Sequence, residues 1–271
     1  DDTTPPVISN VNQSVTPTSA TITWTTDEPA TSRIDYGLTS SYTDFVEDGV
    51  LKTDHSIVLS NLSLGTDYHF QITSADLSGN ISTSTDLTFT TEAQFEIVSD
   101  DFSAPALDTT LWTLEDPIGG ATVAMTGSQA IISIPGGQAH DPWTGGNFAT
   151  RLMQPASDTD FEVEVKFESS LSGGQSYGLL IEETDSRYMR FDINNNGSTN
   201  ILAAYLDGST SDLKINSSIS SITPVWLRVG RVGNDWTYSY SFDGTNWTTA
   251  VTFIQSLVVN EVGPFVGSFG S

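Results

Sequence analysis

The 271-residue sequence contains no cysteine, which excludes disulfide bonds, thiolate metal sites and thiol nucleophiles. Basic residues are also scarce: 9 Lys and Arg stand against 34 Asp and Glu, for a formal net charge of −25. A chain this acidic has little surface with which to neutralise phosphate groups, so nucleic acids and anionic membranes are poor partners. No apolar run approaches the ~20 residues that a membrane-spanning helix needs, so we expect no insertion into a membrane.

Aromatic residues, by contrast, reach 10% of the chain, while charged residues make up only 16%. Ser, Thr, Asn and Gly supply much of the remainder, a mixture typical of β-structure with a polar, uncharged surface. The opening DDTTPP has neither the basic nor the apolar region of a signal peptide, which predicts a mature or excised segment. We therefore expect a secreted or cell-surface protein of a prokaryote. The dispersed acidity favours a neutral polysaccharide over an acidic one as its ligand.

Short alternating strand patterns, separated by turn residues at intervals of roughly 8–12 residues, fill the first third of the chain. Within them, a Trp in the second strand pattern and a Leu…Gly-Thr-x-Tyr corner resemble the fibronectin type III family. The matching residues are Trp24, Leu62, Gly65 and Tyr68. The resemblance covers residues 1–93. It implies a β-sandwich that acts as a spacer or presenting domain, with the Tyr68 hydroxyl capping its own corner.

Two histidines of this region, His55 and His69, lie on predicted strands. Neither has a second histidine, a cysteine or a suitably spaced carboxylate with which to form a metal or catalytic site. We expect both side chains at the protein surface.

Residues 94–271 contain roughly ten further short strand patterns and no helical period longer than about two turns. In the stretch 160–169, Phe161 and Val163 alternate with Glu162 and Glu164, so one face belongs to a core and the other is solvated. Strands without helices over such a length predict a two-sheet sandwich of the jelly-roll type. The whole chain is therefore predicted to be all-β.

This second region resembles the concanavalin A-like lectin/glucanase superfamily, and within it a group of bacterial secreted sandwich domains found beside glycosidase or fibronectin modules. The resemblance covers almost all of 94–271 and is carried by DDFSAPALDTTLWT (100–113), HDPWTGGNFATRLMQ (140–154), DFEVEVKF (160–167), RYMRFDI (187–193) and WLRVGRVGNDWTYSYSFDGTNWT (226–248). Because the superfamily includes lectins, carbohydrate-binding modules, glycanases and lyases, it implies a fold and no single activity. It also implies a structural Ca²⁺ near the strand ends, with Asp100 and Asp101 as candidate ligands.

Domains of this group usually continue past the VGPF segment (262–265) with a further strand that pairs with the opening DDF strand. Here the sequence ends at Ser271. Either the segment stops before its last strand, or the sheet closes differently, with a strand from another molecule. An unfilled slot would leave an edge open to strand exchange.

The richest concentration of sugar-binding residue types lies in residues 140–147 and the strand that follows. Sugars present hydroxyl edges and an apolar ring face, which proteins bind with planar aromatic rings and with Asp, Asn, Arg or His side chains. The candidate ligand-binding residues are His140, Asp141, Trp143, Asn147 and Arg151, together with Arg190 on a later strand. The alternative is structural: Trp143 covers the core and Arg151 pairs with Asp141.

Glu182, Arg190 and Asp192 form a further charged set on two adjacent predicted strands. The apolar neighbours of Arg190 and Asp192 are predicted to face the core, so these two share the opposite face. An Arg among acids either holds a ligand or neutralises its neighbours. If the protein is catalytic, Glu182 with Asp192 or Asp141 would serve as acid and base, with His140 assisting.

A third acidic set, Glu162, Glu164 and Glu168, lies on one face of one strand, as in the glucanases of the superfamily, whose pattern is Glu-x-Asp-x-Glu or Glu-x-Asp-x-x-Glu. The match fails, because the third acid is one residue or more too distant, the second is Glu, and Lys166 intervenes. Outward charge on a solvated face explains these residues better.

The sequence therefore predicts a fibronectin type III domain (1–93) followed by a concanavalin A-like jelly roll (94–271) that binds polysaccharide without cleaving it and needs no cofactor. A glycoside hydrolase or polysaccharide lyase of the same fold is the first alternative. A structural subunit of an extracellular fibre or adhesin is the second.

Overall fold

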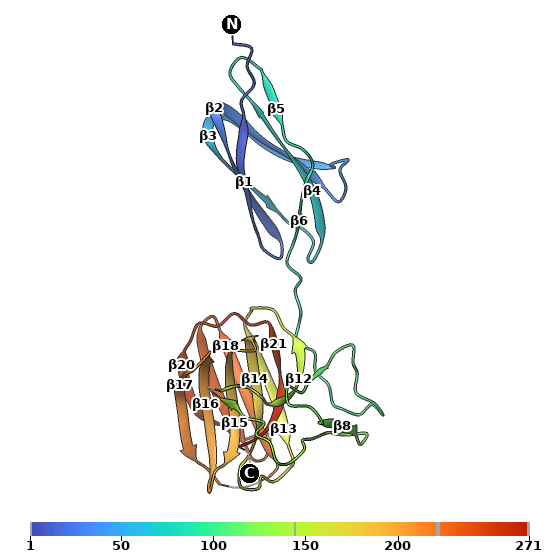
Figure 1. Cartoon of the computed structure of the whole chain (residues 1–271), viewed down its shortest axis with the longest axis vertical. Coiled ribbons are helices and arrows are strands. Elements are labelled where there is room, and N and C mark those ends of the chain that lie inside the picture. Colours follow the sequence, from blue (N-terminus) through green and yellow to red (C-terminus); the bar gives the residue numbers. More distant parts are fainter. Residues whose placement is uncertain (1, 144, 221–222, 270–271) are drawn as a thin grey trace. The chain divides into compact units, whose positions relative to one another are not determined.

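The computed structural model describes residues 2–143, 145–220 and 223–269. Within these ranges the chain forms strands and no helix, which confirms the all-β fold class (Figure 1). None of the described residues belongs to a helix that could cross a membrane. Two compact units, Asp1–Gln94 and Phe95–Ser271, make up the chain and are described separately.

The first unit is an antiparallel assembly built around two long strands. β2 pairs with β1, β3 and β4, and β4 also pairs with β5 and β6. The strands are β1 (Ile8–Val15), β2 (Ser19–Gly37), β3 (Asp44–Ser60), β4 (Asp67–Ala75), β5 (Ile81–Thr83) and β6 (Leu87–Thr90). The Tyr68 hydroxyl accepts a hydrogen bond from the Ser63 backbone nitrogen at 3.0 Å, so the predicted corner forms.

Trp24 lies in the core of the first unit, where it is 1% exposed. Its Nε1 donates to Ser74 Oγ at 3.1 Å, and its ring stacks on His55 with 4.8 Å between the centroids. The predicted surface position of His55 is therefore wrong. Its ring nitrogens are hydrogen-bonded to the hydroxyls of Thr26 and Ser32 at 2.9 and 2.7 Å, which satisfies a polar ring inside a core.

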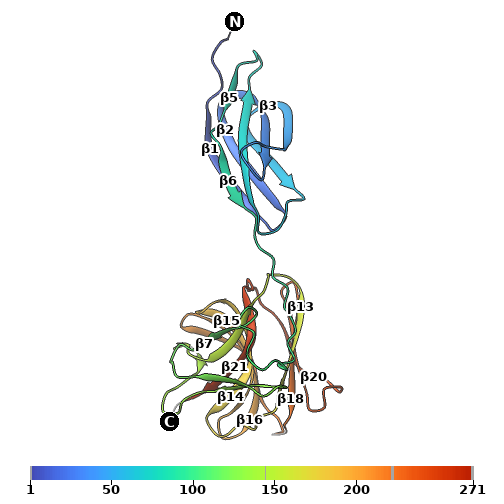
Figure 2. The same cartoon turned by 90° about the vertical axis from the view of Figure 1, so that its right-hand side faces the viewer.

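The second unit contains two sheets that enclose one core (Figure 2). A seven-stranded sheet has the order β17-β16-β15-β14-β21-β12-β7, and a four-stranded sheet has the order β13-β18-β19-β20; β8 with β9 and β10 with β11 form two short hairpins. The strands are β7 (Thr113–Glu115), β8 (Thr122–Met125), β9 (Ala130–Ser133), β10 (Pro142–Trp143), β11 (Gly146–Asn147), β12 (Thr150–Pro155), β13 (Phe161–Phe167), β14 (Gln175–Thr184), β15 (Arg187–Asn195), β16 (Thr199–Asp207), β17 (Thr210–Ser218), β18 (Val225–Val232), β19 (Asp235–Ser241), β20 (Thr248–Ile254) and β21 (Glu261–Ser268).

The core between the two sheets takes every second residue of each strand. For example, the ring centroids of Phe191 on β15 and Tyr238 on β19 lie 5.2 Å apart. Arg190 and Asp192 consequently lie on the opposite face of the seven-stranded sheet, as the alternation predicts. We call this face, which points away from the core, the outer face.

The observed strands differ from the predicted ones at several places. The stretch FEIVSDDF (95–102), for example, has the pattern of a strand. Residues 95–102 form no strand: their backbone is tied to side chains, with Phe95 N donating to Ser157 Oγ and Val98 N donating to Gln154 Oε1. Conversely, β17 has no counterpart among the predicted strands, because this polar and mostly exposed segment lacks a clear apolar alternation.

Candidate functional site

Residues 140–143 and 145–149, here called the strap, cross the outer face of the seven-stranded sheet. His140 exchanges two backbone hydrogen bonds with Ser268, of 2.8 and 3.2 Å, which fastens the start of the strap to β21. The strap passes directly over Gly267, where a Cβ atom would lie 2.7 Å from the His140 carbonyl oxygen and 2.7 Å from Ser176 Oγ. A residue with a side chain at position 267 would therefore displace the strap.

Arg190 joins the strap to the sheet below it. Its guanidinium is buried and donates to Asp192 on the same strand, with Nε 2.7 Å from Oδ2. It also donates to two strap acceptors, Asp141 Oδ1 at 3.0 Å and the Pro142 carbonyl at 2.8 Å. The Trp143 ring centroid lies 5.4 Å from the same guanidinium, a cation–π distance that helps to hold the indole in place.

The charge of Arg190 is more than balanced by its partners. Burial raises the pKa of Asp192, and the Arg190 charge opposes that effect. With Asp141 included, two carboxylates face one guanidinium. This part of the site therefore carries an excess of negative charge whenever both carboxyls are ionised.

An open pocket of ≈ 370 Å³ lies beside the strap. Its floor comes from three neighbouring strands, since Asn194 is paired with Asn200 and Leu202 with Asn216 across β15, β16 and β17. The lining consists of Asp141, Trp143, Arg190, Asn194, Asn196, Asn200, Leu202, Asn216 and Phe269. Aromatic rings together with amide and carboxylate groups are the means by which proteins bind a sugar ring and its hydroxyls.

The side-chain amides of the pocket differ in how far the protein already uses them. Asn200 is tied to Ser198 and Ser218, and the Asn194 amide donates to Asp192 Oδ1 at 3.2 Å. The amide of Asn216, which also lines the pocket, has no hydrogen-bond partner among the described residues. Asn216 is thus available to a ligand without loss of a contact inside the protein.

A second charged cluster surrounds Arg151, outside the pocket. Its guanidinium, whose side chain is 2% exposed, pairs with Glu115, with Glu182 at 2.9 Å and with Asp185 at 2.8 Å. Asn147 Nδ2 donates to Glu182 Oε1 at 2.8 Å. Burial raises the pKa of Glu182 to about 7, and Arg151 lowers it less because three carboxylates share one guanidinium.

The pocket unites only part of the predicted site. Asp141, Trp143 and Arg190 line it, whereas three other predicted ligand-binding residues, His140, Asn147 and Arg151, are buried outside the pocket lining. They are excluded from contact with a ligand in this structure because the strap's own packing and ion pairs enclose them.

The candidate catalytic carboxyls are enclosed as well. Glu182 is 2% exposed and Asp192 0%, and each is paired with an arginine. Of the predicted acid and base candidates, only Asp141 reaches the pocket, since His140 is 0% exposed. The described part of the pocket therefore contains no pair of carboxylates that could lie on either side of a sugar.

Six pocket residues were not predicted from the sequence: Asn194, Asn196, Asn200, Leu202, Asn216 and Phe269. The run Asn194-Asn195-Asn196 before a glycine is a local signal that could have indicated two of them, Asn194 and Asn196. The others meet only through the register of β15, β16 and β17.

The expected calcium ligands lie in a loop ahead of β7. Asp100 accepts hydrogen bonds from Phe102 N and from Trp112 Nε1, both at 2.8 Å, and Asp101 accepts one from Ser103 N at 3.0 Å. Among the described residues, three acidic side chains come close together only in the groups Asp2, Glu28 and Asp76, and Glu115, Glu182 and Asp185. Neither group includes Asp100 or Asp101, and Arg151 supplies the positive charge in the second.

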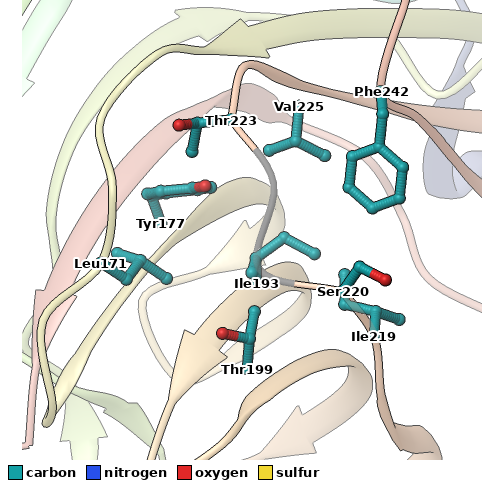
Figure 3. Close-up of a pocket in the computed structure, with 9 residues that line it drawn as sticks. All are labelled: Leu171, Tyr177, Ile193, Thr199, Ile219, Ser220, Thr223, Val225 and Phe242. Atoms are coloured by element: carbon teal, nitrogen blue, oxygen red, sulfur yellow. The ribbon is translucent and has the colours of Figure 1, made fainter.

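A further cavity, between the two sheets, is shown in Figure 3. Apolar side chains and hydroxyl groups line it together, and its volume is only ≈ 10 Å³, about the space that one water molecule needs. Leu171, Tyr177, Ile193, Thr199, Ile219, Ser220, Thr223, Val225 and Phe242 line it. It is therefore a packing defect of the core and too small for a sugar.

Residues 99–270 match the family model described as "Beta xylosidase C-terminal Concanavalin A-like domain", and residues 5–91 match "Purple acid Phosphatase, N-terminal domain". No curated protein matches the chain.

Solved structures that share the fold include the following three. The GH43 protein BlXynB from Bacillus licheniformis is 10% identical with a TM-score of 0.54 over 96% of this chain and 61% of that one. A xylan beta-1,4-xylosidase from Bacillus halodurans C-125 is 12% identical with a TM-score of 0.52, over 97% and 62% of the two chains. The Bacteroides ovatus protein Xyloglucan PUL GH43B is 10% identical with a TM-score of 0.52, over 98% and 63%.

The chain spans less than two thirds of the length of these three structures, and at such low identities the likeness concerns the fold alone. The family match is more extensive, because residues 99–270 are more than half of the chain. Together with the two-sheet architecture of the second unit, it shows that this chain belongs to the family of β-xylosidase C-terminal concanavalin A-like domains.

Proposed function

We propose that the second unit binds polysaccharide, without cleaving it, in the pocket beside the strap. The observation that carries this proposal is the pocket itself, where the Trp143 ring, the Asp141 carboxylate and the unused Asn216 amide meet on a floor of paired strands. The Trp143 ring and the Asp141 carboxylate are already held by Arg190 before a ligand arrives, which lowers the entropic cost of binding.

The proposed ligand is a neutral glycan. Arg190, the one cation among the described residues of the lining, is already bound by Asp141 and Asp192, so its charge is not available to a carboxylate on a uronic acid. An acidic sugar would instead meet an excess of negative charge. Because two of the similar structures carry xylosidase or xyloglucan in their names, xylan and xyloglucan are the first ligands to test.

The absence of cleavage is proposed from the position of the carboxyl groups. Glycoside hydrolysis generally needs two carboxylates on either side of the scissile bond. Here Glu182 and Asp192 are buried and paired with arginines, and Asp141 alone reaches the described pocket.

A glycoside hydrolase remains the second candidate, and one observation favours it. The pKa of Glu182, raised to about 7, lies in the range that a general acid uses near neutral pH. For Glu182 to act, the strap residue Asn147 would have to move away from it. Sugar release from a polysaccharide that disappears in Glu182→Gln would establish this activity.

Outside the pocket, the sequence patterns support two further proposals. We propose that the first unit is a fibronectin type III spacer and that the protein acts outside a prokaryotic cell. A structural Ca²⁺ at Asp100 and Asp101 is a proposal that chelation tests, since a melting temperature unchanged by EGTA would contradict it. Strand exchange is also a proposal. Because β21 lies inside the seven-stranded sheet, a strand from another molecule would have to pair with an edge strand, and the nearest edge is the three-residue β7.

Calorimetric titration of the whole chain with xylan, xyloglucan, β-glucan, pectin and alginate tests the function. We expect saturable binding of at least one neutral glycan, weaker binding of pectin and alginate, and no release of reducing sugar. Tighter binding of the two acidic polymers would contradict the proposed ligand class, and no binding of any polymer would contradict the function.

A further inference from the structure

We propose that Asn196 is a site of spontaneous deamidation that changes the pocket as the protein ages. The sequence contains a single Asn-Gly dipeptide, Asn196-Gly197, and Asn196 belongs to the pocket lining. Asparagine is among the chemically labile residues of proteins. Its side chain is attacked most readily when glycine follows, because glycine has no side chain to hinder the approach of its own nitrogen.

The local structure leaves both reacting groups unengaged. Asn196 and Gly197 are exposed in the turn that joins β15 to β16, between the paired residues Asn195 and Thr199. Neither the Asn196 amide nor the Gly197 backbone nitrogen forms a hydrogen bond with a described residue. No heavy atom lies within 4 Å of the position that a Gly197 Cβ would occupy, and the φ angle of Gly197 is +88°.

The neighbouring asparagines of the pocket do not share these conditions. Asn194 and Asn195 are each followed by another asparagine, and their side-chain amides donate to Asp192 and to the Leu171 carbonyl. Asn200 is tied to Ser198 and is followed by isoleucine. The reaction is therefore expected at Asn196 first.

The chemistry needs only water and base. The deprotonated Gly197 nitrogen attacks Cγ of Asn196, a new N–C bond forms, and the bond from Cγ to the side-chain nitrogen breaks with release of ammonia. Water then opens the resulting succinimide at one of its two carbonyls. The products are aspartate or isoaspartate at position 196, with one water consumed and one ammonia released.

Both products alter the site in which the proposed function would take place, and this part of the inference rests on that function. A carboxylate replaces an amide donor in a pocket whose one lining arginine, Arg190, is already paired with two carboxylates, Asp141 in the lining and Asp192 buried beneath it. Isoaspartate also lengthens the main chain of the turn that sets the pairing of Asn195 with Thr199. We expect glycan affinity to fall about two- to tenfold, the effect of losing one hydrogen bond.

The modification is tested by peptide mass spectrometry on the whole chain after incubation in mildly alkaline buffer. We expect the mass gain of an amide-to-acid conversion at Asn196, with isoaspartate present, before any other asparagine reacts. Asn196→Gln keeps an amide in the pocket but reacts far more slowly, so it is the matched control. A wild-type chain that stays unmodified at Asn196, or reacts elsewhere first, would overturn the assignment.

Glycan titration tests whether deamidation of Asn196 weakens binding, separately from whether the deamidation occurs. Aged wild-type protein and Asn196→Asp are expected to bind more weakly than fresh protein, while aged Asn196→Gln keeps the affinity of its fresh form. Modified protein that binds as tightly as fresh protein would overturn the effect on the pocket. If fresh protein binds no glycan at all, the proposed function fails, whereas the modification is still decided by the mass measurement.

Discussion

The guanidinium of Arg190 and the carboxylate of Asp141 lie 3.0 Å apart and connect the outer face of the sheet to the strap. The same guanidinium also holds Asp192, which is 0% exposed. One buried arginine thus supports the sheet beneath the pocket and fixes the wall of the pocket. The two roles can be separated by substituting its two partners.

Replacement of Arg190 is expected to destabilise the second unit. Arg190→Met leaves the buried Asp192 without its counter-charge, which costs about 3–5 kcal/mol in the free energy of unfolding. The measurement is urea unfolding of the whole chain. The double variant Arg190→Met with Asp192→Leu should recover much of the loss. An Arg190→Met chain as stable as wild type would show that the ion pair is not important for folding.

Asp141→Asn is expected to change glycan affinity more than the free energy of unfolding. Asp141 is partly exposed and contributes through one hydrogen bond to Arg190, so the unfolding free energy should change by no more than about 1 kcal/mol. Glycan affinity should fall, because a carboxylate that accepts from sugar hydroxyls is replaced by a weaker acceptor. Calorimetry and urea unfolding of the same samples check this. An unaltered affinity would show that Asp141 does not contact the glycan.

Glu182 is expected to make the stability of the second unit depend on pH. Its pKa is about 7 in the folded protein against an ordinary value of 4.5, so the folded state binds this proton more tightly than the unfolded state. The stabilisation is complete below pH 4.5 and is lost as the pH rises through 7, a change of about 3 kcal/mol. In Glu182→Gln the unfolding free energy should be flatter over this range. Identical pH profiles would contradict the raised pKa.

His55 is expected to give the first unit the opposite dependence. Burial lowers its pKa from 6.5, so the unfolded state binds the proton more tightly and the unit loses stability as the pH falls through 6.5. Hydrogen exchange of the β2 amides, corrected for intrinsic rates, reports this. His55→Phe keeps a ring against Trp24 and should abolish the dependence, although it leaves Ser32 without its partner. An unchanged slope in the variant would assign the effect to another group.

Gly267 is expected to be required for the position of the strap. A Cβ in Gly267→Ala would come within 2.7 Å of the His140 carbonyl, whereas a Cβ at Gly173 meets no atom within 4 Å. Gly267→Ala should therefore weaken glycan binding, and Gly173→Ala should not. Equal affinities of the two variants would indicate that the strap does not shape the pocket.

The fold class could be predicted from the sequence because its main signal, the alternation of apolar and polar residues along a strand, is local. In β13, Phe161 and Val163 alternate with Glu162 and Glu164, and this period of two alone assigns a strand and its buried face. Residues 95–102 have a similar pattern, yet they form no strand, because side chains of Ser157 and Gln154 bind their backbone. Hydrogen bonds from residues so distant in sequence cannot be predicted from a local pattern.

The candidate site was predicted only in part for a similar reason. Trp143 and Asp141 belong to one short loop whose composition is suggestive by itself. Asn216 lies on a strand without apolar alternation, and it reaches the pocket only because Leu202 of β16 pairs with it. His140 and Arg151 have the residue types of a sugar site, but their burial depends on where the strap lies across β21.

The central claim, that the pocket beside the strap binds a glycan, is tested most directly by titrating the preferred neutral glycan into Asn216→Ala and Ser211→Ala. Both residues lie on β17, and only Asn216 lines the pocket. Because the Asn216 amide has no hydrogen-bond partner among the described residues, its removal should leave the melting temperature unchanged. We predict affinity about two- to tenfold weaker in Asn216→Ala and unaltered in Ser211→Ala. Wild-type affinity in Asn216→Ala, with saturable binding retained, would show that the glycan binds elsewhere than in this pocket.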